Sequence, residues 1–179
     1  MLLATLLTRA RWFFWTGFYR LFGRLLFQDL GHGCWFEGWV DVPALGGEIR
    51  IGDGVRFCRW VSLTAPRGGR IDIGAHSFIG RGVVISAHES VQIGRHCLIA
   101  EYVCIHDNDH ALEELAPTPA FVKSPVQIGD NCWLGAQSIL VRGSSMDTGC
   151  VLGAGGVLTS HLGPGSVAVG VPARVARVR

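Results

Sequence analysis

Hydrophobic residues return every six positions along most of this 179-residue chain. They form five sets of three, which are Ile51/Phe57/Leu63, Ile73/Ile79/Ile85, Ile93/Ile99/Ile105, Ile128/Leu134/Leu140 and Met146/Leu152/Leu158. A period of six fits neither the 3.6-residue α-helix nor the alternation of a strand, but three such steps make one 18-residue turn of a parallel β-helix. The spacing therefore predicts an all-β chain wound into a parallel β-helix of about five to seven coils.

A second column of small side chains supports this register. These residues follow many of the hydrophobic ones by four positions, and they are Val55, Ser77, Val83, Cys97, Val103, Cys132, Ser138, Cys150 and Gly156. Coils that stack roughly 4.8 Å apart would bring such residues into ladders where backbones crowd. The six cysteines include no CxxC pair, so we interpret them as reduced apolar filler in a cytoplasmic protein.

The coil has one long interruption. Met146 follows Ile128 by 18 residues, whereas Ile128 follows Ile93 by 35. The excess falls in loop 106–125, and long loops on rigid scaffolds are often functional. The loop begins with two histidines and two aspartates within His106–His110. This concentration favours a site for either metal ligation or general-base catalysis by a histidine.

Residues 1–32 differ from the β-helix domain predicted for 33–179. Trp12, Trp15, Tyr19, Phe22 and Leu26 recur at helical spacing, while Arg9, Arg20 and Arg24 project on another side. The arginines are too frequent for a membrane span, and no signal-peptide pattern is present. This amphipathic helix is expected either to cap the open end of the coil or, through residues 9–27, to lie on a membrane surface. The net charge of only +2 gives no electrostatic case for nucleic acid as a partner.

Several motifs occur in order around the interruption. They are IHDNDH, PVQIGDNCWLGAQSILVRG, VLGAGGVLTS and the ending GVPARVARVR. Over roughly residues 49 to 179 the chain resembles the left-handed parallel β-helix acyltransferases with hexapeptide repeats, in particular the maltose/galactoside and polysaccharide O-acetyltransferase branch. The resemblance implies a left-handed coil, a homotrimer, acetyl-CoA as cosubstrate and no metal.

The resemblance also implies roles for individual residues. His110 falls on the family's general base, Asp107 or Glu101 is hypothesised to hold its tautomer, and Asn108, Arg81 and His88 are candidates for acceptor binding. The positions that match the family's coenzyme A motifs are Trp133, Gly135, Ala136, Gly153, Ala154, Thr159, Ser160, Arg174 and Arg177. The chain departs from the family at Ser160–His161, where many relatives carry Lys-Asp.

The expected activity is transfer of acetyl to a sugar hydroxyl. The coils before the loop lack the polar residues of small-sugar members, which favours a polysaccharide precursor or a lipid- or nucleotide-linked glycan at the inner face of the membrane. Two alternatives differ in class. One is a metal hydratase like the γ-type carbonic anhydrases, with His88, His106 and His110 as ligands, and the other is a catalytically silent trimeric scaffold.

Overall fold

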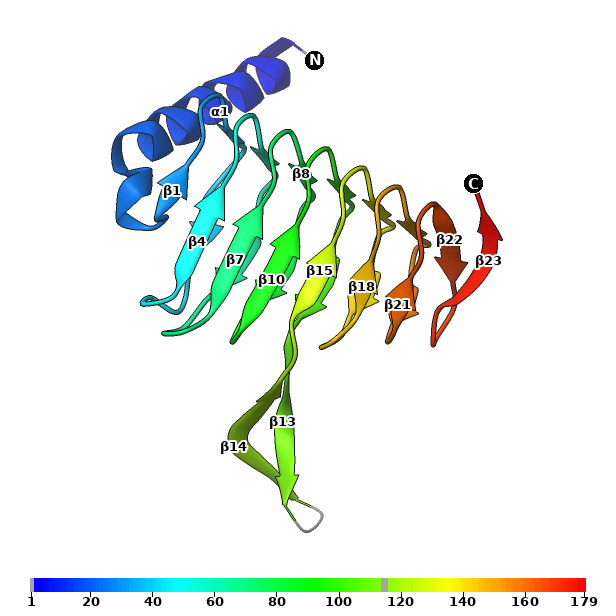
Figure 1. The fold of residues 1–179 in the computed structure, drawn as a ribbon. Helices are drawn as coiled ribbons and strands as arrows, with labels where there is room; N and C mark the ends of the chain where they lie inside the picture. The colour runs from blue at the N-terminus through cyan, green and yellow to red at the C-terminus, as the bar shows by residue number, and fades with distance from the viewer. Residues whose placement is uncertain (1, 114–115) are drawn as a thin grey trace.

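The computed structural model describes residues 2–113 and 116–179, with side chains from residue 10 onward within these ranges. The side chain of Arg9 and loop residues Glu114 and Leu115 lie outside the described part. The strands form a three-sided coil whose axis runs from left to right in Figure 1. Strands along the chain enter the three sheets in turn, and the chain completes six coils and begins a seventh. The predicted left-handed parallel β-helix is confirmed.

Each side of the coil is one sheet of short strands, which are all parallel except the C-terminal strand of sheet 2. Sheet 1 contains β1 (Asp29–Leu30), β4 (Glu48–Ile51), β7 (Arg70–Ile73), β10 (Ser90–Ile93), β15 (Val126–Ile128), β18 (Ser145–Met146) and β21 (His161–Leu162). Sheet 2 contains β2 (Trp35–Phe36), β5 (Arg56–Phe57), β8 (Phe78–Ile79), β11 (Leu98–Ile99), β16 (Trp133–Leu134), β19 (Val151–Leu152), β22 (Ser166–Val169) and β23 (Arg174–Val178). Sheet 3 contains β3 (Val40–Asp41), β6 (Val61–Thr64), β9 (Val84–Ser86), β12 (Cys104–His106), β17 (Ile139–Leu140) and β20 (Val157–Leu158).

The six-residue column is the core of the coil. Ile73 pairs with Ile51 on one side and Ile93 on the other, and Ile128 pairs with Met146 in the same ladder. All fifteen hydrophobic residues of the five predicted sets are at most 3% exposed. The small-residue column is buried as well, its cysteines included. The predicted register is therefore confirmed throughout the repeat.

A further coil precedes the first predicted set. Leu30 pairs with Ile51 and Phe36 pairs with Phe57, so β1 to β3 stack directly on the next coil. The helix α1 (Leu2–Phe22) and the 3₁₀ turn Gly23–Leu25 end before this coil starts at Asp29. The predicted boundary between residues 32 and 33 thus falls inside the first coil, because this coil has few of the branched residues that mark the later ones.

Helix α1 lies against the N-terminal end of the coil (Figure 1). The Tyr19 hydroxyl is fully buried, where it accepts a hydrogen bond from the Val40 backbone N–H at 2.8 Å. Thr16 Oγ1 accepts one from the Phe36 N–H at 3.1 Å. These bonds satisfy backbone groups that the first coil would otherwise leave unpaired. Among the described helices, none is long and apolar enough to cross a membrane.

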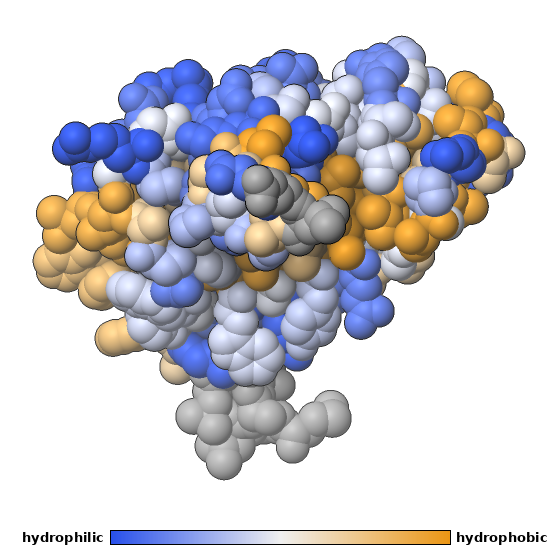
Figure 2. Space-filling model, turned by 90° about the horizontal axis from the view of Figure 1, so that it is seen from below, coloured by the Kyte–Doolittle hydropathy of each residue, from blue (hydrophilic) through white to orange (hydrophobic). Residues whose placement is uncertain are grey.

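Hydrophobic surface gathers at the two ends of the coil. The view from below shows hydrophobic residues towards the left and right sides and hydrophilic ones along the upper edge (Figure 2). Exposed hydrophobic residues near the ends include Leu21, Leu25 and Leu45 at one end and Val171 and Val175 at the other. At the C-terminal end, β23 folds back antiparallel on β22 and forms the last strand of sheet 2.

Candidate active site

The interruption of the coil is an antiparallel hairpin. It consists of β13 (Asn108–Glu113) and β14 (Ala116–Lys123), and it projects downward from the coil in Figure 1. The Ser124 N–H donates to the Asp107 carbonyl at 2.9 Å, which closes the hairpin where it leaves the coil. An ion pair between Asp109 and Arg142 fastens the first strand to the following coil. The hairpin is therefore tied to the coil at its base and through Asp109.

Three aromatic rings pack against one another, tilted by 34° and 49°, at the base of this hairpin. His110 lies opposite Phe121 in the strand register, and their ring centroids are 4.6 Å apart. The ring of His88, from the corner after β9, lies 4.2 Å from the same Phe121 ring. The Nδ1 of His110 is 2.8 Å from the Thr118 carbonyl oxygen. Because a carbonyl can only accept a hydrogen bond, Nδ1 carries the proton in the neutral ring, and Nε2 keeps its lone pair.

Asp107 anchors the corner that carries His88. Its carboxylate is completely buried and accepts hydrogen bonds from the backbone N–H groups of His88 at 2.8 Å and of Glu89 and Ser90, both at 2.7 Å. The Asn108 side chain donates to it at 3.0 Å. The carboxylate thus fixes the geometry of this corner through backbone groups.

The tautomer of His110 is held by a backbone carbonyl within the described ranges. The carboxylates of Asp107 and Glu101 are not among the hydrogen-bond partners found there for this ring. The role hypothesised for these two residues stays a prediction, while the contact observed at Nδ1 is with Thr118.

Burial lowers the pKa of two neighbouring histidines. Desolvation is the main cause of the lowered pKa of His88 and of His106, and the charge of Asp107 opposes it in both. Both rings are therefore neutral near pH 7. In residues 2–113 and 116–179, no group of three His, Cys, Asp or Glu side chains is arranged to hold a metal ion.

The predicted donor residues lie at a different corner of the coil. The backbone N–H groups of Tyr102, Gln137 and Gly155 bond to the carbonyls of Arg81, Glu101 and Ala136 one coil earlier, at 2.8 to 2.9 Å. These bonds align Arg81, Glu101, Ala136 and Ala154 in one column at the corner between sheets 2 and 3. Gly135 approaches the backbone of Ala154 so closely that a Cβ on it would lie 2.5 Å from the Ala154 nitrogen. The sequence therefore places small residues where adjacent coils crowd.

The other predicted donor residues lie beside this column or away from it. Trp133 is 52% exposed on β16, next to the column. Arg174 and Arg177 lie on β23, where they pair with Val169 and Val167 at the end of sheet 2.

The structure brings some predicted site residues together and separates others. The corner between sheets 3 and 1 brings together His88, Asp107, Asn108 and His110. Thr159 and Ser160 lie at the same corner, two coils after the hairpin. Arg81, Glu101 and the alanines lie at the other end of the sheet 3 strands. A turn at Glu101–Tyr102 and the strand β12 separate the column from His106. Within one chain, the candidate base and the candidate donor column are thus apart.

The sequence did not reveal Thr118 and Phe121. Both contact His110 through the pairing of β13 with β14. The hairpin register determines these contacts, and the loop shows no alternation or two-residue turn motif from which that register could be read.

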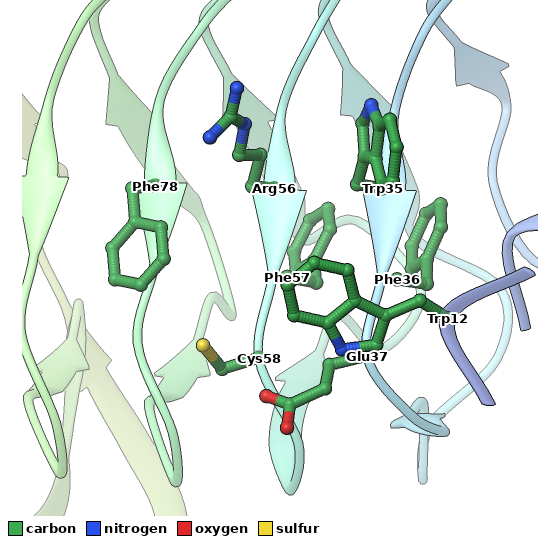
Figure 3. A pocket seen from close by; sticks show the side chains of 8 residues that line it. All are labelled: Trp12, Trp35, Phe36, Glu37, Arg56, Phe57, Cys58 and Phe78. Carbon is green, nitrogen blue, oxygen red and sulfur yellow. The ribbon is translucent and has the colours of Figure 1, made fainter. Parts of the chain in front are cut away.

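A separate cavity lies under α1 at the N-terminal end. It has a volume of about 230 Å³ and lies between Trp12 of the helix and the outer face of sheet 2. Figure 3 shows its eight lining side chains, which are Trp12, Trp35, Phe36, Glu37, Arg56, Phe57, Cys58 and Phe78. Burial and the nearby Glu37 raise the pKa of Cys58 to about 11, so its thiol is neutral near pH 7.

Comparison with known proteins places the chain in a family. A family model described as the hexapeptide repeat of succinyl-transferase matches residues 70–100 and 125–160. A Mycobacterium tuberculosis protein named a probable acetyltransferase is 33% identical over 155 residues, which cover 84% of this chain and 49% of that protein. An Escherichia coli protein assigned as a lipopolysaccharide biosynthesis O-acetyl transferase is 30% identical over 139 residues, which cover 72% of this chain and 71% of that protein.

A solved structure has the same fold. The hexapeptide-repeat acetyltransferase of Vibrio cholerae in complex with acetyl coenzyme A matches with a TM-score of 0.63 and 24% identity, over 87% of this chain and 73% of that one. The match to the mycobacterial relative spans only about half of that protein, 49% of its length. The repeats, the fold and the identity to the lipopolysaccharide relative agree, and this chain belongs to the hexapeptide-repeat acyltransferase family.

Proposed function

We propose that this protein transfers acetyl from acetyl-CoA to a hydroxyl of a sugar, with His110 as the general base. The observation that carries the proposal is the state of the His110 ring. Its Nδ1 is engaged by the Thr118 carbonyl at 2.8 Å, and its Nε2 has the lone pair needed to accept a proton. The hairpin presents this ring from a rigid coil, and the relatives of known name are acetyltransferases.

The reaction follows from the chemistry of that ring. A sugar hydroxyl is a weak nucleophile at neutral pH, and general-base removal of its proton supplies about 10²- to 10⁴-fold in rate. Nε2 of His110 takes the proton as the hydroxyl oxygen bonds to the thioester carbonyl carbon. Collapse of the tetrahedral intermediate breaks the carbon–sulfur bond, and the thiolate of coenzyme A leaves and is protonated. The Thr118 carbonyl stabilises the cationic imidazolium that forms in between.

The donor is proposed to lie along the corner column of Ala136 and Ala154. Small residues there leave room for a pantetheine arm against the backbone, with Trp133, Gly135 and Gly153 nearby. Thr159 and Ser160, which lie at the corner between sheets 3 and 1, stay predicted donor contacts. Arg174 and Arg177 would meet the phosphates of the nucleotide end. The Vibrio cholerae protein of the same fold is described in complex with acetyl coenzyme A, which supports this donor.

A homotrimer would join the two halves of the site. In one chain the hairpin of His110 and the column of Ala136 lie at different corners of the triangular coil. If the hairpin corner of one copy meets the column of the next, each site takes its base from one chain and its donor groove from the neighbouring chain. A closed ring of three copies then completes all three sites. Light scattering should then give a mass of three chains of 19.4 kDa.

The acceptor is proposed to be a polysaccharide precursor or a lipid- or nucleotide-linked glycan, bound with the help of Asn108, Arg81 and His88. The support is the Escherichia coli relative assigned to lipopolysaccharide biosynthesis.

A transfer assay tests the proposal directly. Purified protein with acetyl-CoA should release coenzyme A thiol when a panel of sugars, nucleotide sugars and lipid-linked glycans is supplied. Acetyl-CoA alone should raise the melting temperature, because a ligand bound only to the folded state stabilises it. The scaffold alternative predicts neither effect. Metal-dependent CO₂ hydration without thiol release would instead favour the hydratase.

Helix α1 is proposed to hold the protein at the inner membrane surface. The helix exposes Phe13, Phe14 and Leu21, and the 3₁₀ turn that follows it exposes Leu25, to between 64% and 79%. Arg20 and Arg24 are exposed on the same segment, and residues 2–25 include no acidic residue. Aromatic and aliphatic side chains flanked by arginines suit the interface of an anionic bilayer.

Vesicle flotation checks this placement. The protein should float with vesicles that contain phosphatidylglycerol and much less with neutral phosphatidylcholine vesicles. The double variant Leu21→Glu/Leu25→Glu should stay in the soluble fraction, whereas Leu112→Glu, an equally exposed change on the hairpin, should float like the wild type. Equal flotation of both variants would contradict membrane binding through the helix.

A further inference from the structure

A serine, a histidine and an aspartate contact one another in series on the outer face of sheet 1. The Ser145 hydroxyl lies 3.0 Å from Nδ1 of His161, and Nε2 of the same ring lies 3.4 Å from the Asp147 carboxylate. An activated nucleophile has this arrangement, in which a hydroxyl lies within hydrogen-bond reach of a base and a third group orients that base. The acetyl transfer proposed above uses none of these three residues.

The stacking of two coils brings the three side chains together. Ser145 pairs with His161 in the register between β18 and β21, which are neighbours in Figure 1. Met146 is buried in the core, and its two neighbours Ser145 and Asp147 are both partly exposed. Alternation along the chain therefore places these two on the same outer face. Because adjacent strands are about 4.8 Å apart, the His161 ring can contact the residue opposite it and the one diagonal to it.

The two neighbours of the His161 ring determine the roles of its nitrogens. The ionised Asp147 carboxylate can only accept a hydrogen bond, so it favours the neutral ring with its proton on Nε2. Nδ1 then has the lone pair that accepts the proton of the Ser145 hydroxyl. Among the ion pairs found in residues 2–113 and 116–179, this is the only one in which Asp147 takes part. The carboxylate is thus available to orient this base.

An open cavity of about 380 Å³ lies beside the three residues. All of them line it, together with the amide side chains of Gln92 and Gln127. Gln127 pairs with Ser145 on the side opposite His161. Side-chain amides can donate to the oxyanion that forms when a serine attacks a carbonyl group. The cavity therefore combines a nucleophile, a base, a candidate oxyanion donor and room for a small substrate.

We propose that Ser145 and His161, with Asp147 as the positioning residue, form a second catalytic site that hydrolyses esters of small carboxylic acids. Nδ1 of His161 takes the Ser145 proton as Oγ bonds to the ester carbonyl carbon. The bond from this carbon to the alcohol oxygen breaks, and the alcohol leaves with that proton. Water then gives a proton to the same nitrogen and attacks the acyl carbon. The bond from Oγ to the acyl carbon breaks, Oγ regains the proton, and the carboxylic acid is released.

Ester hydrolysis by the full-length protein in the absence of coenzyme A tests the proposal. With p-nitrophenyl acetate as the probe, Ser145→Ala and His161→Gln should each release nitrophenol at least about tenfold more slowly than the wild type. Ser62→Ala is the matched control, because Ser62 also lies within 3.4 Å of a carboxylate, that of Asp41, but has no histidine among its hydrogen-bond partners in the described ranges. It should react like the wild type.

Two variants of Asp147 test its positioning role. Asp147→Asn should lower kcat for the ester and leave KM and the melting temperature unchanged, since the carboxylate contacts the base and lies on the partly exposed outer face. Asp147→Glu should recover part of kcat, because it restores the negative charge. Hydrolysis by Asp147→Asn at the wild-type rate would overturn this role.

A covalent probe locates the nucleophile. A fluorophosphonate should bond to the Ser145 oxygen with loss of fluoride, and fragmentation mass spectrometry should find the adduct on this residue. The proposal is overturned if Ser145 carries no adduct, or if Ser145→Ala releases nitrophenol as fast as the wild type. Neither assay contains coenzyme A. A labelled Ser145 in a protein that releases no thiol from acetyl-CoA would therefore support this site while the acetyltransferase proposal fails.

Discussion

Replacing His110 with alanine is expected to lower kcat for acetyl transfer by about 10²- to 10⁴-fold, the range that a general base supplies. The loss should fall on kcat more than on KM for acetyl-CoA, because the donor column is at another corner of the coil. The melting temperature should change little, since the ring is exposed and packs against Phe121 without filling the core. Thiol release under saturating substrates is the measurement.

Two further variants sharpen this result. His110→Gln keeps a hydrogen-bonding group but has no basic nitrogen, so it should be as inactive as His110→Ala. His96→Asn changes an exposed histidine at a left-handed position that asparagine tolerates, and it should keep full activity. Turnover retained in both His110 variants would contradict the assignment of the base.

Replacing Asp107 with alanine is expected to lower the free energy of unfolding by about 3 to 5 kcal/mol. The change leaves the backbone N–H groups of His88, Glu89 and Ser90 buried without acceptors, and each such loss costs about 1 to 3 kcal/mol. Urea denaturation at fixed protein concentration measures the effect. Glu113→Ala, an exposed change on the same hairpin, should stay within about 0.5 kcal/mol of the wild type.

The kinetics of Asp107→Asn distinguish two roles for this residue. If Asp107 only holds the corner, the pH dependence of kcat should keep the wild-type midpoint, and activity should fall only as far as folding does. If Asp107 also stabilises the imidazolium of His110, the midpoint should shift to lower pH, because removing a negative charge lowers the pKa of a nearby histidine. An unchanged unfolding midpoint in Asp107→Ala would show that the three hydrogen bonds contribute nothing to stability.

The coil could be predicted from the sequence because its core repeats one physical requirement. Every sixth side chain points inward, so the positions of Ile73, Ile79 and Ile85 specify both the fold and the register. The first coil follows the same rule with Leu30 and Phe36, six residues apart, but it is broken by glycines and lies next to a helix. The boundary with the helix could therefore not be placed from the repeat alone.

The candidate site was only partly accessible to sequence reasoning. The concentration of polar residues at His106–His110 pointed to the segment where the hairpin leaves the coil, since chemistry requires particular residue types. The partners of His110 come from the opposite strand of a hairpin, and which residue faces which depends on pairing. Thr118 and Phe121 are therefore properties of the folded hairpin that the order of amino acids does not display.

The regular stacking of the coil also sets distances in discrete steps. Arg81, Glu101, Ala136 and Ala154 occupy consecutive coils, each about 4.8 Å from the next. Gain or loss of one 18-residue coil would lengthen or shorten the corner by that step and leave every inward ladder in register. The separation between Arg81 and Ala136 along this corner is thus counted in whole coils. Duplication of a coil would therefore adapt this corner to a longer acceptor without any change in the packing of the core.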